Sequence, residues 1–218
     1  MRRIFIIGGA GKVARYLAPR LTKQGDHPVS LYRHFEQEPE LKALGAEPVY
    51  GDLAKLSPES LSQLMAGCDA VVFSAGAGGK GGKENTKAID GDGLEKSVEA
   101  AKLAGIERFI LVSAFPEAGR GQPISDTFEY YMEVKKAADV YLVASGLDWV
   151  IVRPGTLTDD AATTLVNAGL AVSYGNVSRD NVAATLAYII AHDAIKRVII
   201  ELTDGDQPIE QALAKFQR

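Results

Sequence analysis

Residues 3–15 read RIFIIGGAGKVAR, and this stretch decides the fold class. Its first five residues form a mostly apolar run that is rich in β-branched side chains and closed by glycines, which predicts a buried strand. The residues that follow predict a tight turn and then a helix, because Val13, Leu17 and Leu21 recur at helical spacing. Pro19 falls inside this helix, where we expect it to remove a backbone hydrogen bond and kink the chain.

The turn carries small residues at two overlapping spacings. Gly9, Gly11 and Ala14 fit G-x-G-x-x-G/A, and Gly8, Gly11 and Ala14 fit G-x-x-G-x-x-A. In either register one glycine permits the turn, one lets backbone amides approach a pyrophosphate, and the third small residue lets the helix pack on the strand. The helix N-terminus also offers unpaired N–H groups to phosphates. We therefore predict dinucleotide binding here, with an ordinary glycine turn as the alternative.

Composition and local sequence exclude several other classes. A formal net charge of -4 gives no electrostatic reason to expect nucleic-acid binding. The single cysteine, Cys68, leaves no internal disulfide or thiol metal cluster to propose, and we predict no metal site. A nucleoside-triphosphatase loop is excluded because Val13 follows Gly11-Lys12 where Ser or Thr is required. No apolar run is long enough to cross a membrane, so we expect a cytoplasmic protein with no membrane partner.

The rest of the chain alternates strand-like and helix-like segments. We predict strands at residues 28–32, 47–50, 69–73, 109–112, 149–152 and 198–202, and helices from about 58, 86–103, 128–144, 181–191 and after 208. The glycine tract 74–82 predicts a lid beside a ligand or a plain surface loop, and 116–126 predicts an irregular loop. This order predicts an α/β fold: a doubly wound parallel sheet (Rossmann fold) with helices on both faces. We expect one domain over 1–218, with a small substrate-side portion formed mainly by 155–218.

Ligands in this fold bind beyond the carboxyl ends of the strands, so the residues after each strand are the candidates for a site. After the second strand, Arg33 stands where proteins that prefer NAD usually carry an acid. An arginine would instead neutralise a 2′-phosphate, because its planar fork matches phosphate oxygens. We therefore predict NADP as the cofactor, with Lys12 as a helper; the alternative is that Arg33 is a solvated strand end.

Further cofactor contacts are expected after the other strands. Asp52 could accept a hydrogen bond from an adenine amino group, or it could stabilise the turn in which it lies. Pro154 and Gly155 end the sixth strand, where backbone groups could meet a nicotinamide carboxamide. Three small residues after the fourth strand would let a cofactor lie across the strand ends: Ser74, Ala75 and Gly76.

One group of residues has catalytic character. Tyr131 and Lys135 are four residues apart on a predicted helix and therefore share a face. A neighbouring ammonium favours the phenolate, so we expect Lys135 to lower the pKa of Tyr131 and also to hold a ribose hydroxyl. Ser113, at the end of the fifth strand, could hydrogen-bond the oxygen of a carbonyl or alcohol. The alternative for the pair is a solvated helix face.

These features together resemble the short-chain dehydrogenase/reductase superfamily, specifically its small atypical members related to nucleotide-sugar epimerases and flavin reductases. The resemblance covers almost the whole chain and is carried by residues 8–14, 33, 51–53, 74–78, 89–93, 111–113, 131–135, 145–155 and 203–206. It implies a Rossmann fold, NADP, and a proton relay of Ser113, Tyr131 and Lys135. It adds Val13 and Leu53 to the cofactor-binding set. Standard members have a water-holding asparagine on the helix after the fourth strand, where this chain has Asp90 as its candidate catalytic residue.

The resulting prediction is an NADP-dependent oxidoreductase acting on a small carbonyl, quinone or flavin-like substrate. Tyr131 would act as the general acid, Lys135 as its pKa modulator and Ser113 as the residue that orients the substrate. Little chain follows Gly155, which favours a small substrate. Two alternatives stay open: an epimerase or dehydratase that uses the cofactor without net consumption, and a non-catalytic NADP-sensing regulator. The expected partner is a small-molecule substrate, and a homodimer is left open.

Overall fold

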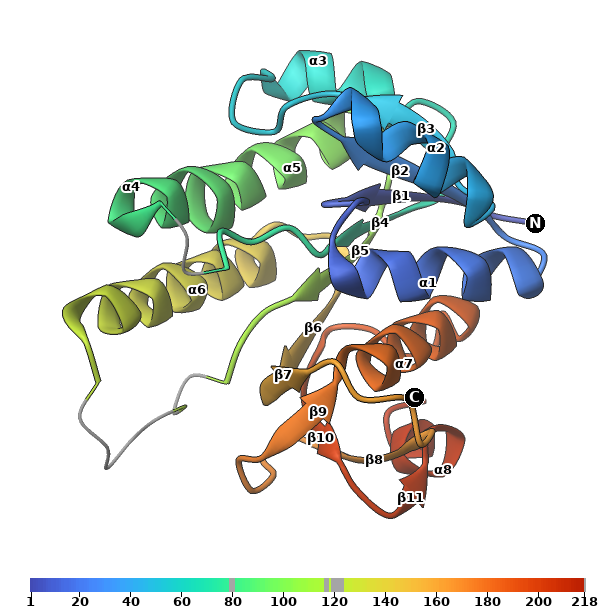
Figure 1. Cartoon of the computed structure of the whole chain (residues 1–218), viewed down its shortest axis with the longest axis vertical. Coiled ribbons are helices and arrows are strands. Elements are labelled where there is room, and N and C mark those ends of the chain that lie inside the picture. The colour runs from blue at the N-terminus through green and yellow to red at the C-terminus, as the bar shows by residue number, and fades with distance from the viewer. Residues whose placement is uncertain (79–80, 116–117, 119–123, 218) are drawn as a thin grey trace.

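The computed structural model describes residues 1–78, 81–115, 118 and 124–217, which form one α/β domain built around a mostly parallel sheet (Figure 1). Within these residues nine strands pair in the order β11-β8-β10-β6-β5-β4-β1-β2-β3. β1 lies between β2 and β4, with Ile6 opposite Ser30 on one side and Val72 on the other. The parallel strands are β1 (Arg3–Ile7), β2 (His27–Tyr32), β3 (Glu47–Tyr50), β4 (Ala70–Phe73), β5 (Arg108–Val112), β6 (Asp148–Pro154) and β10 (Val198–Asp204). The doubly wound fold predicted from the sequence is confirmed.

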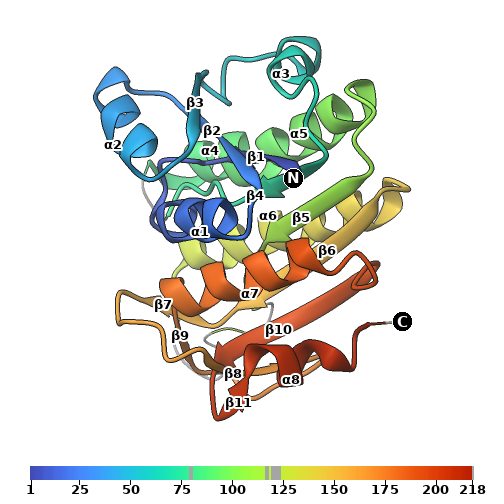
Figure 2. The same cartoon turned by 90° about the vertical axis from the view of Figure 1, so that its right-hand side faces the viewer.

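Helices cover both faces of the sheet, as Figure 2 shows from one side. One face carries α1 (Lys12–Lys23), α7 (Arg179–Ala191) and α8 (Ile209–Ala214), and the other carries α3 (Pro58–Leu64), α5 (Asp92–Leu103) and α6 (Asp126–Ala144). The short helix α2 (Glu38–Ala43) lies beside α1, to which the Arg15–Glu40 ion pair connects it at 2.8 Å.

The core lies in two layers, one on each face of the sheet. Ile4 and Ile6 of β1 join one layer, while Phe5 and Ile7 join the other. This division follows from the strand geometry, in which successive side chains point to opposite faces. All four side chains are fully buried, and each contributes roughly 1.5–3 kcal/mol to folding by leaving water. The continuous apolar run of β1 is therefore explained by burial on both sides.

The structure differs from the sequence prediction mainly after Gly155. That segment was expected to hold one strand and two helices, but it also contains β7 (Thr156–Thr158), β8 (Leu165–Gly169), β9 (Asn176–Ser178) and β11 (Gln207–Pro208). β8 runs antiparallel to β10, and β11 runs antiparallel to β8, so the expected parallel sheet is mixed at this edge. These strands are short and pair with distant segments, which leaves no clear local signal.

Smaller differences concern the helices. α2 was not predicted, and the helix expected from residue 86 begins earlier, with α4 (Gly82–Thr86) and a π-helical turn, η2 (Lys87–Gly91), before α5. The helix α1 runs through Pro19 without interruption. Residues 79–80 of the glycine tract and residues 116–117 and 119–123 of the predicted loop lie outside the described residues. No helix in the described residues has the length and apolar character needed to cross a membrane.

A close approach of two backbone segments holds the small β7–β9 sheet at the carboxyl end of β6. Gly155 donates its N–H to the carbonyl of Leu202, and Thr156 donates to the carbonyl of Gly175, both at 2.9 Å. A Cβ at position 155 would lie 2.0 Å from the oxygen of Gly175, which no real side chain tolerates. Gly155 is therefore required by packing.

We expect Gly155→Ala to lower the free energy of unfolding by roughly 1–3 kcal/mol, because the added methyl must push the two segments apart. Gly175→Ala is the matched control, since a Cβ there would lie no closer than 3.7 Å to a neighbour. Urea unfolding followed by circular dichroism measures both variants. Equal stability of the two variants would contradict the close approach.

Candidate cofactor and catalytic site

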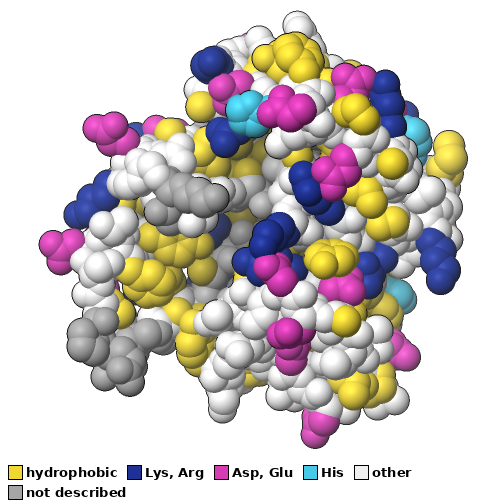
Figure 3. All heavy atoms as spheres, in the orientation of Figure 1, with side chains coloured by type: hydrophobic (Ala, Val, Ile, Leu, Met, Phe, Trp, Pro, Cys, Tyr) yellow, Lys and Arg dark blue, Asp and Glu magenta, His cyan; other side chains and the backbone are white. Residues whose placement is uncertain are grey.

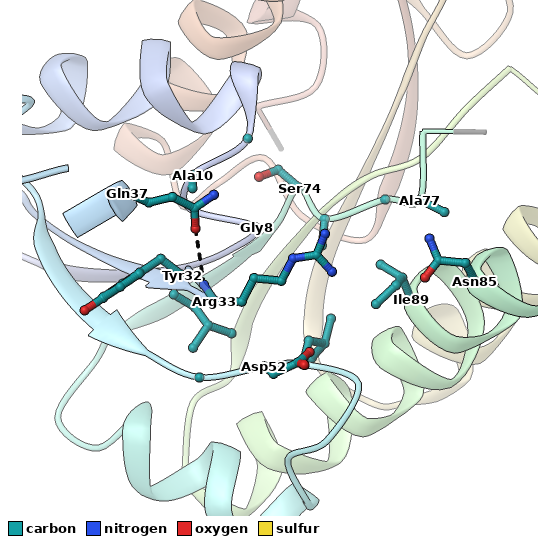
Figure 4. A pocket seen from close by; sticks show the side chains of 16 residues that line it. Gly8, Ala10, Tyr32, Arg33, Gln37, Asp52, Ser74, Ala77, Asn85 and Ile89 are labelled. Carbon is teal, nitrogen blue, oxygen red and sulfur yellow. Dashed lines mark hydrogen bonds between the residues drawn. The ribbon is translucent and has the colours of Figure 1, made fainter. Parts of the chain in front are cut away.

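A pocket of about 250 Å³ opens at the carboxyl ends of β1, β2, β3 and β4 (Figure 4). The carboxyl ends of neighbouring parallel strands meet at one edge of the sheet, and the residues after them meet there too. Eight predicted cofactor-binding residues line this pocket: Gly8, Gly11, Arg33, Asp52, Leu53, Ser74, Ala75 and Gly76. The other eight lining residues were not among those predicted: Ala10, Leu31, Tyr32, Gln37, Gly51, Ala77, Asn85 and Ile89.

The glycine turn has the geometry that a pyrophosphate requires. Gly8 has φ +80°, and a Cβ there would lie 2.7 Å from the backbone of Ala75. Gly11 is the N-cap of α1 and has no side chain with which to bond the first amides of that helix. Uncapped amides and the positive end of a helix dipole suit a phosphate group. The turn therefore fits a dinucleotide.

The structure shows which of the two overlapping glycine spacings describes the residues that face the pocket. Gly8 and Gly11 face the pocket and Ala14 is fully buried, so G-x-x-G-x-x-A describes the residues at the ligand side. Gly9 is buried against β2, where it donates its N–H to the carbonyl of Leu31 at 3.0 Å and a Cβ would lie 2.5 Å from Ser30. Gly9 thus packs the turn onto the sheet and does not line the pocket.

Two other predicted residues of the turn also lie away from the pocket lining. Lys12 is exposed and forms an ion pair with Asp159, which follows β7, at 2.5 Å. Asp159 is also paired with Arg179 at 2.6 Å. Val13 is buried in the core beneath α1. Its side chain therefore packs in the core and does not line the pocket.

Arg33 is exposed at the end of β2, and its guanidinium points into the pocket (Figure 4). Among the described residues, no ion pair or side-chain hydrogen bond engages this guanidinium. The side-chain oxygen of Gln37 accepts hydrogen bonds from the backbone N–H groups of Arg33 at 3.3 Å and His34 at 3.2 Å. Gln37 thereby shapes the segment that presents the cation.

The remaining lining residues show how the pocket is built. Asp52 accepts a hydrogen bond from the N–H of Ala54 at 3.1 Å, so it stabilises its own turn while also lining the pocket. Ser74 donates its hydroxyl to the carbonyl of Ile7 at 3.2 Å, which ties the loop after β4 to β1. The next residues are small, and Gly76 is exposed to solvent.

Lys135 lies in a buried cluster beside this pocket. Its side chain is almost completely buried, and its ammonium donates to the carbonyl of Val112 at 3.2 Å and to Asp90 at 3.5 Å. Asp90 also accepts the N–H of Ala77 at 2.9 Å. Burial lowers the pKa of Lys135, but Tyr131, Asp90 and Asp139 raise it more, so the net pKa lies above its ordinary value. Lys135 is therefore charged at neutral pH.

The pKa of Tyr131 departs from the sequence prediction. Burial raises this pKa most, Lys135 lowers it, and Asp90 and Asp139 raise it again, leaving it above the ordinary value. Lys135 thus acts in the expected direction but does not outweigh the loss of hydration. The phenol is therefore protonated at neutral pH, which a proton donor has to be.

Ser113 and Asp139 form the other side of the cluster. Ser113 is buried and donates its backbone N–H to Val152 at 2.7 Å, while its hydroxyl has no hydrogen-bond partner among the described residues. Asp139 pairs with Arg153 at 2.8 Å. Burial raises the pKa of Asp139 although Ser113 and Arg153 lower it, so the hydroxyl lies near the carboxyl without hydrogen-bond geometry.

Asp139 was missed in the sequence although a signal was present. It lies four residues after Lys135 and eight after Tyr131, and the three therefore share one face of α6. The sequence prediction stopped at the tyrosine and lysine. Pro154 and Gly155 lie at the end of β6, next to Ser113 across the strands, and are not part of the pocket lining.

The fold and the pocket define a nucleotide-binding α/β protein, and comparison with known proteins gives the family. Residues 8–193 match the NAD(P)H-binding family, and the chain belongs to that family. The chain is 38% identical to the uncharacterized sugar epimerase YhfK of Bacillus subtilis, over 98% of this chain and 100% of that protein.

Two solved structures are also similar over nearly their whole length. One, from Bacillus halodurans, is assigned provisionally as an NAD-dependent epimerase/dehydratase; it is 33% identical with a TM-score of 0.90, covering 99% of this chain and 100% of that one. The other is the oxidoreductase ylbE from Lactococcus lactis, which is 28% identical with a TM-score of 0.86, covering 98% and 95% of the two chains. The chain is thus an NAD(P)-binding protein of the atypical short-chain dehydrogenase/reductase type, whose relatives include proteins described as epimerases and oxidoreductases.

In the protein without cofactor, we expect the Tyr131 phenol to ionise above the ordinary tyrosine pKa of roughly 10. Lys135→Met should raise this pKa further, because the ammonium stabilises the phenolate, and Asp90→Asn should lower it. The measurement is ultraviolet absorbance against pH, taken as the difference between each protein and its Tyr131→Phe counterpart. Ionisation of Tyr131 below the ordinary value would show that the charge of Lys135 outweighs burial.

Proposed function

We propose that this protein is an NADP-dependent oxidoreductase that reduces a small carbonyl compound through Ser113, Tyr131 and Lys135. One observation carries the proposal: a protonated Tyr131 lies one helical turn from the buried, charged Lys135, at the edge of the sheet where the dinucleotide pocket opens. The description of the Lactococcus lactis relative as an oxidoreductase supports it. The choice of NADP rests on Arg33, whose guanidinium points into the pocket.

Ser113, Tyr131 and Lys135 each have a separate role in the proposed reduction. The bound cofactor supplies a hydride to the carbonyl carbon. Ser113 has an unpaired hydroxyl that can donate to the substrate oxygen and orient it. Tyr131 then transfers its proton to that oxygen as negative charge develops there. The Lys135 ammonium stabilises the phenolate that remains, which is the effect it has on the pKa of Tyr131.

Asp90 and Asp139 keep these groups in place. Asp90 neutralises Lys135 and holds the N–H of Ala77, so the relay and the loop after β4 share one carboxylate. Asp139 lies between Ser113 and Arg153. Both carboxylates are almost fully buried, and removing either would leave a cation without its partner.

An epimerase is the second candidate, because the relatives from two Bacillus species are described in those terms. The same relay could move a proton and a hydride out of the substrate and back again. Such an enzyme would form product with no net oxidation of NADPH, which distinguishes the two reactions.

Arg33→Ala should weaken NADPH binding about 10- to 100-fold, because a charge-assisted hydrogen bond to phosphate contributes roughly 1.5–3 kcal/mol. NADH binding should change little, since NADH has no 2′-phosphate. Lys23→Ala removes the same charge at the far end of α1 and serves as the control. Titration calorimetry with both cofactors gives the constants. If wild type bound NADH as tightly as NADPH, the assignment of Arg33 would be overturned.

Tyr131→Phe should lower kcat for NADPH-dependent carbonyl reduction by about 10²- to 10⁴-fold, the usual contribution of a general acid. NADPH affinity should stay within about twofold, since the pocket does not include the phenol. Tyr130→Phe is the control, because it removes the hydroxyl of a neighbouring tyrosine whose ring lies near Lys83. Its kcat should stay at the wild-type level. Steady-state absorbance of NADPH measures each variant. Equal kcat for Tyr131→Phe and wild type would remove Tyr131 from the mechanism.

A further inference from the structure

Tyr174 lies in the connection between β8 and β9, and two contacts hold its side chain. Its ring packs edge-on against Phe115, with the ring centres 5.4 Å apart and the planes at 71°. Its hydroxyl hydrogen-bonds the side-chain oxygen of Thr156 at 2.7 Å. The carbonyl of the next residue, Gly175, accepts the N–H of Thr156. The ring is therefore fixed at both its edge and its tip.

These contacts place Tyr174 near the proposed relay. Phe115 follows Ser113 by two residues, which limits the distance between their Cα atoms to about 7 Å. Thr156 directly follows Gly155 at the end of β6, the strand whose Val152 accepts the N–H of Ser113. Phe115 and Tyr174 therefore lie beyond the carboxyl ends of β5 and β6, next to the small β7–β9 sheet.

The exposure of the two rings is unequal. Phe115 is 4% exposed, whereas Tyr174 is 50% exposed although both its ends are held. Figure 3 shows a hollow between the part of the molecule formed by α4 and α6 and the part formed by α1 and the β7–β9 sheet, with hydrophobic side chains on its walls. A rigid, half-exposed aromatic ring offers a flat apolar surface to a ligand.

A second aromatic pair lies on α6. The rings of Phe128 and Tyr131 have their centres 6.2 Å apart, so the proposed proton donor itself has an aromatic neighbour. The cations that join this region to α1 and α7, Lys12 and Arg179, are both paired to Asp159. These three side chains therefore keep one net positive charge, and the feature of this region that a planar ring can use is its aromatic surface.

From these observations, and resting on the proposed reductase function, we propose that Tyr174 is a wall of the substrate site. The substrate is a planar ring whose carbonyl is conjugated with it, and the ring stacks on the exposed face of Tyr174. In the reaction, a C–H bond forms at the carbonyl carbon with hydride from NADPH, which is oxidised to NADP⁺. The electron pair of the C=O bond takes the proton of Tyr131, giving the alcohol, and solvent returns a proton to the phenolate.

The test compares two bicyclic ketones of similar size, α-tetralone with its aromatic ring and saturated decalone. Wild type should show a higher kcat/KM for α-tetralone. Tyr174→Leu should raise the KM for α-tetralone about three- to tenfold, the range expected for loss of one aromatic contact, and leave kcat and the decalone KM unchanged. Tyr174→Phe keeps the ring and should stay close to wild type. Equal kcat/KM for the two ketones, or an equal effect of Tyr174→Leu on both, would overturn the proposal.

A binding measurement separates this inference from the proposed function. Quenching of protein fluorescence by α-tetralone in the presence of NADP⁺ reports on the ring site without turnover. Tetralone binding that is weakened by Tyr174→Leu, with no NADPH oxidation by wild type, would keep the ring site and reject the reductase. If Tyr174→Leu oxidised NADPH with the same kinetic constants as wild type, the reductase function would stand and the ring site would be rejected. Absence of tetralone binding to wild type would reject the ring site as well.

Discussion

Lys135 carries its charge into a region from which water is excluded, and the candidate site depends on how that charge is compensated. A lone buried ammonium would lose its proton or unfold the region around it. Here it donates to the carbonyl of Val112 and pairs with Asp90, which in turn holds the N–H of Ala77. One charge therefore connects the end of β5, helix α6, the π-helical turn η2 and the loop that lines the dinucleotide pocket. These are the elements that must keep a fixed relation if a cofactor and a proton donor are to meet one substrate.

This arrangement gives a physical meaning to Asp90, the residue that resemblance matches to the asparagine of standard short-chain dehydrogenases. An amide could hold water but could not neutralise an ammonium. With Asp90 and Asp139 facing Lys135 and Arg153, the buried cluster contains two anions and two cations. Burial still dominates the pKa of Tyr131, which stays above its ordinary value. The protein therefore keeps Tyr131 in its protonated form at neutral pH.

Residues whose surroundings are local were predicted well from the sequence. The apolar run of β1, the glycines after it and the helical spacing of α1 identified the first unit, and the alternation of strands and helices identified the doubly wound sheet. Arg33 and the small residues after β4 were expected at the pocket and lie there. The strands β7, β8, β9 and β11 were missed because each is short and pairs with a segment far along the chain. Asp139 was missed although its spacing from Lys135 places both on one face of α6.

The sequence by itself determined the fold class, the position of the glycine turn and the edge of the sheet at which a ligand must bind, because these follow from periodicity and from the glycines and charges at the strand ends. Only the tertiary structure decided which glycines face the pocket, because the sequence fits both glycine spacings equally well. In the structure Gly9 packs on β2, while Gly8 and Gly11 line the pocket. It also decided that Lys12 pairs with Asp159 and that burial outweighs the effect of Lys135 on the pKa of Tyr131. Burial and charge pairing depend on segments far apart in sequence, and a linear pattern carries no record of how closely they approach.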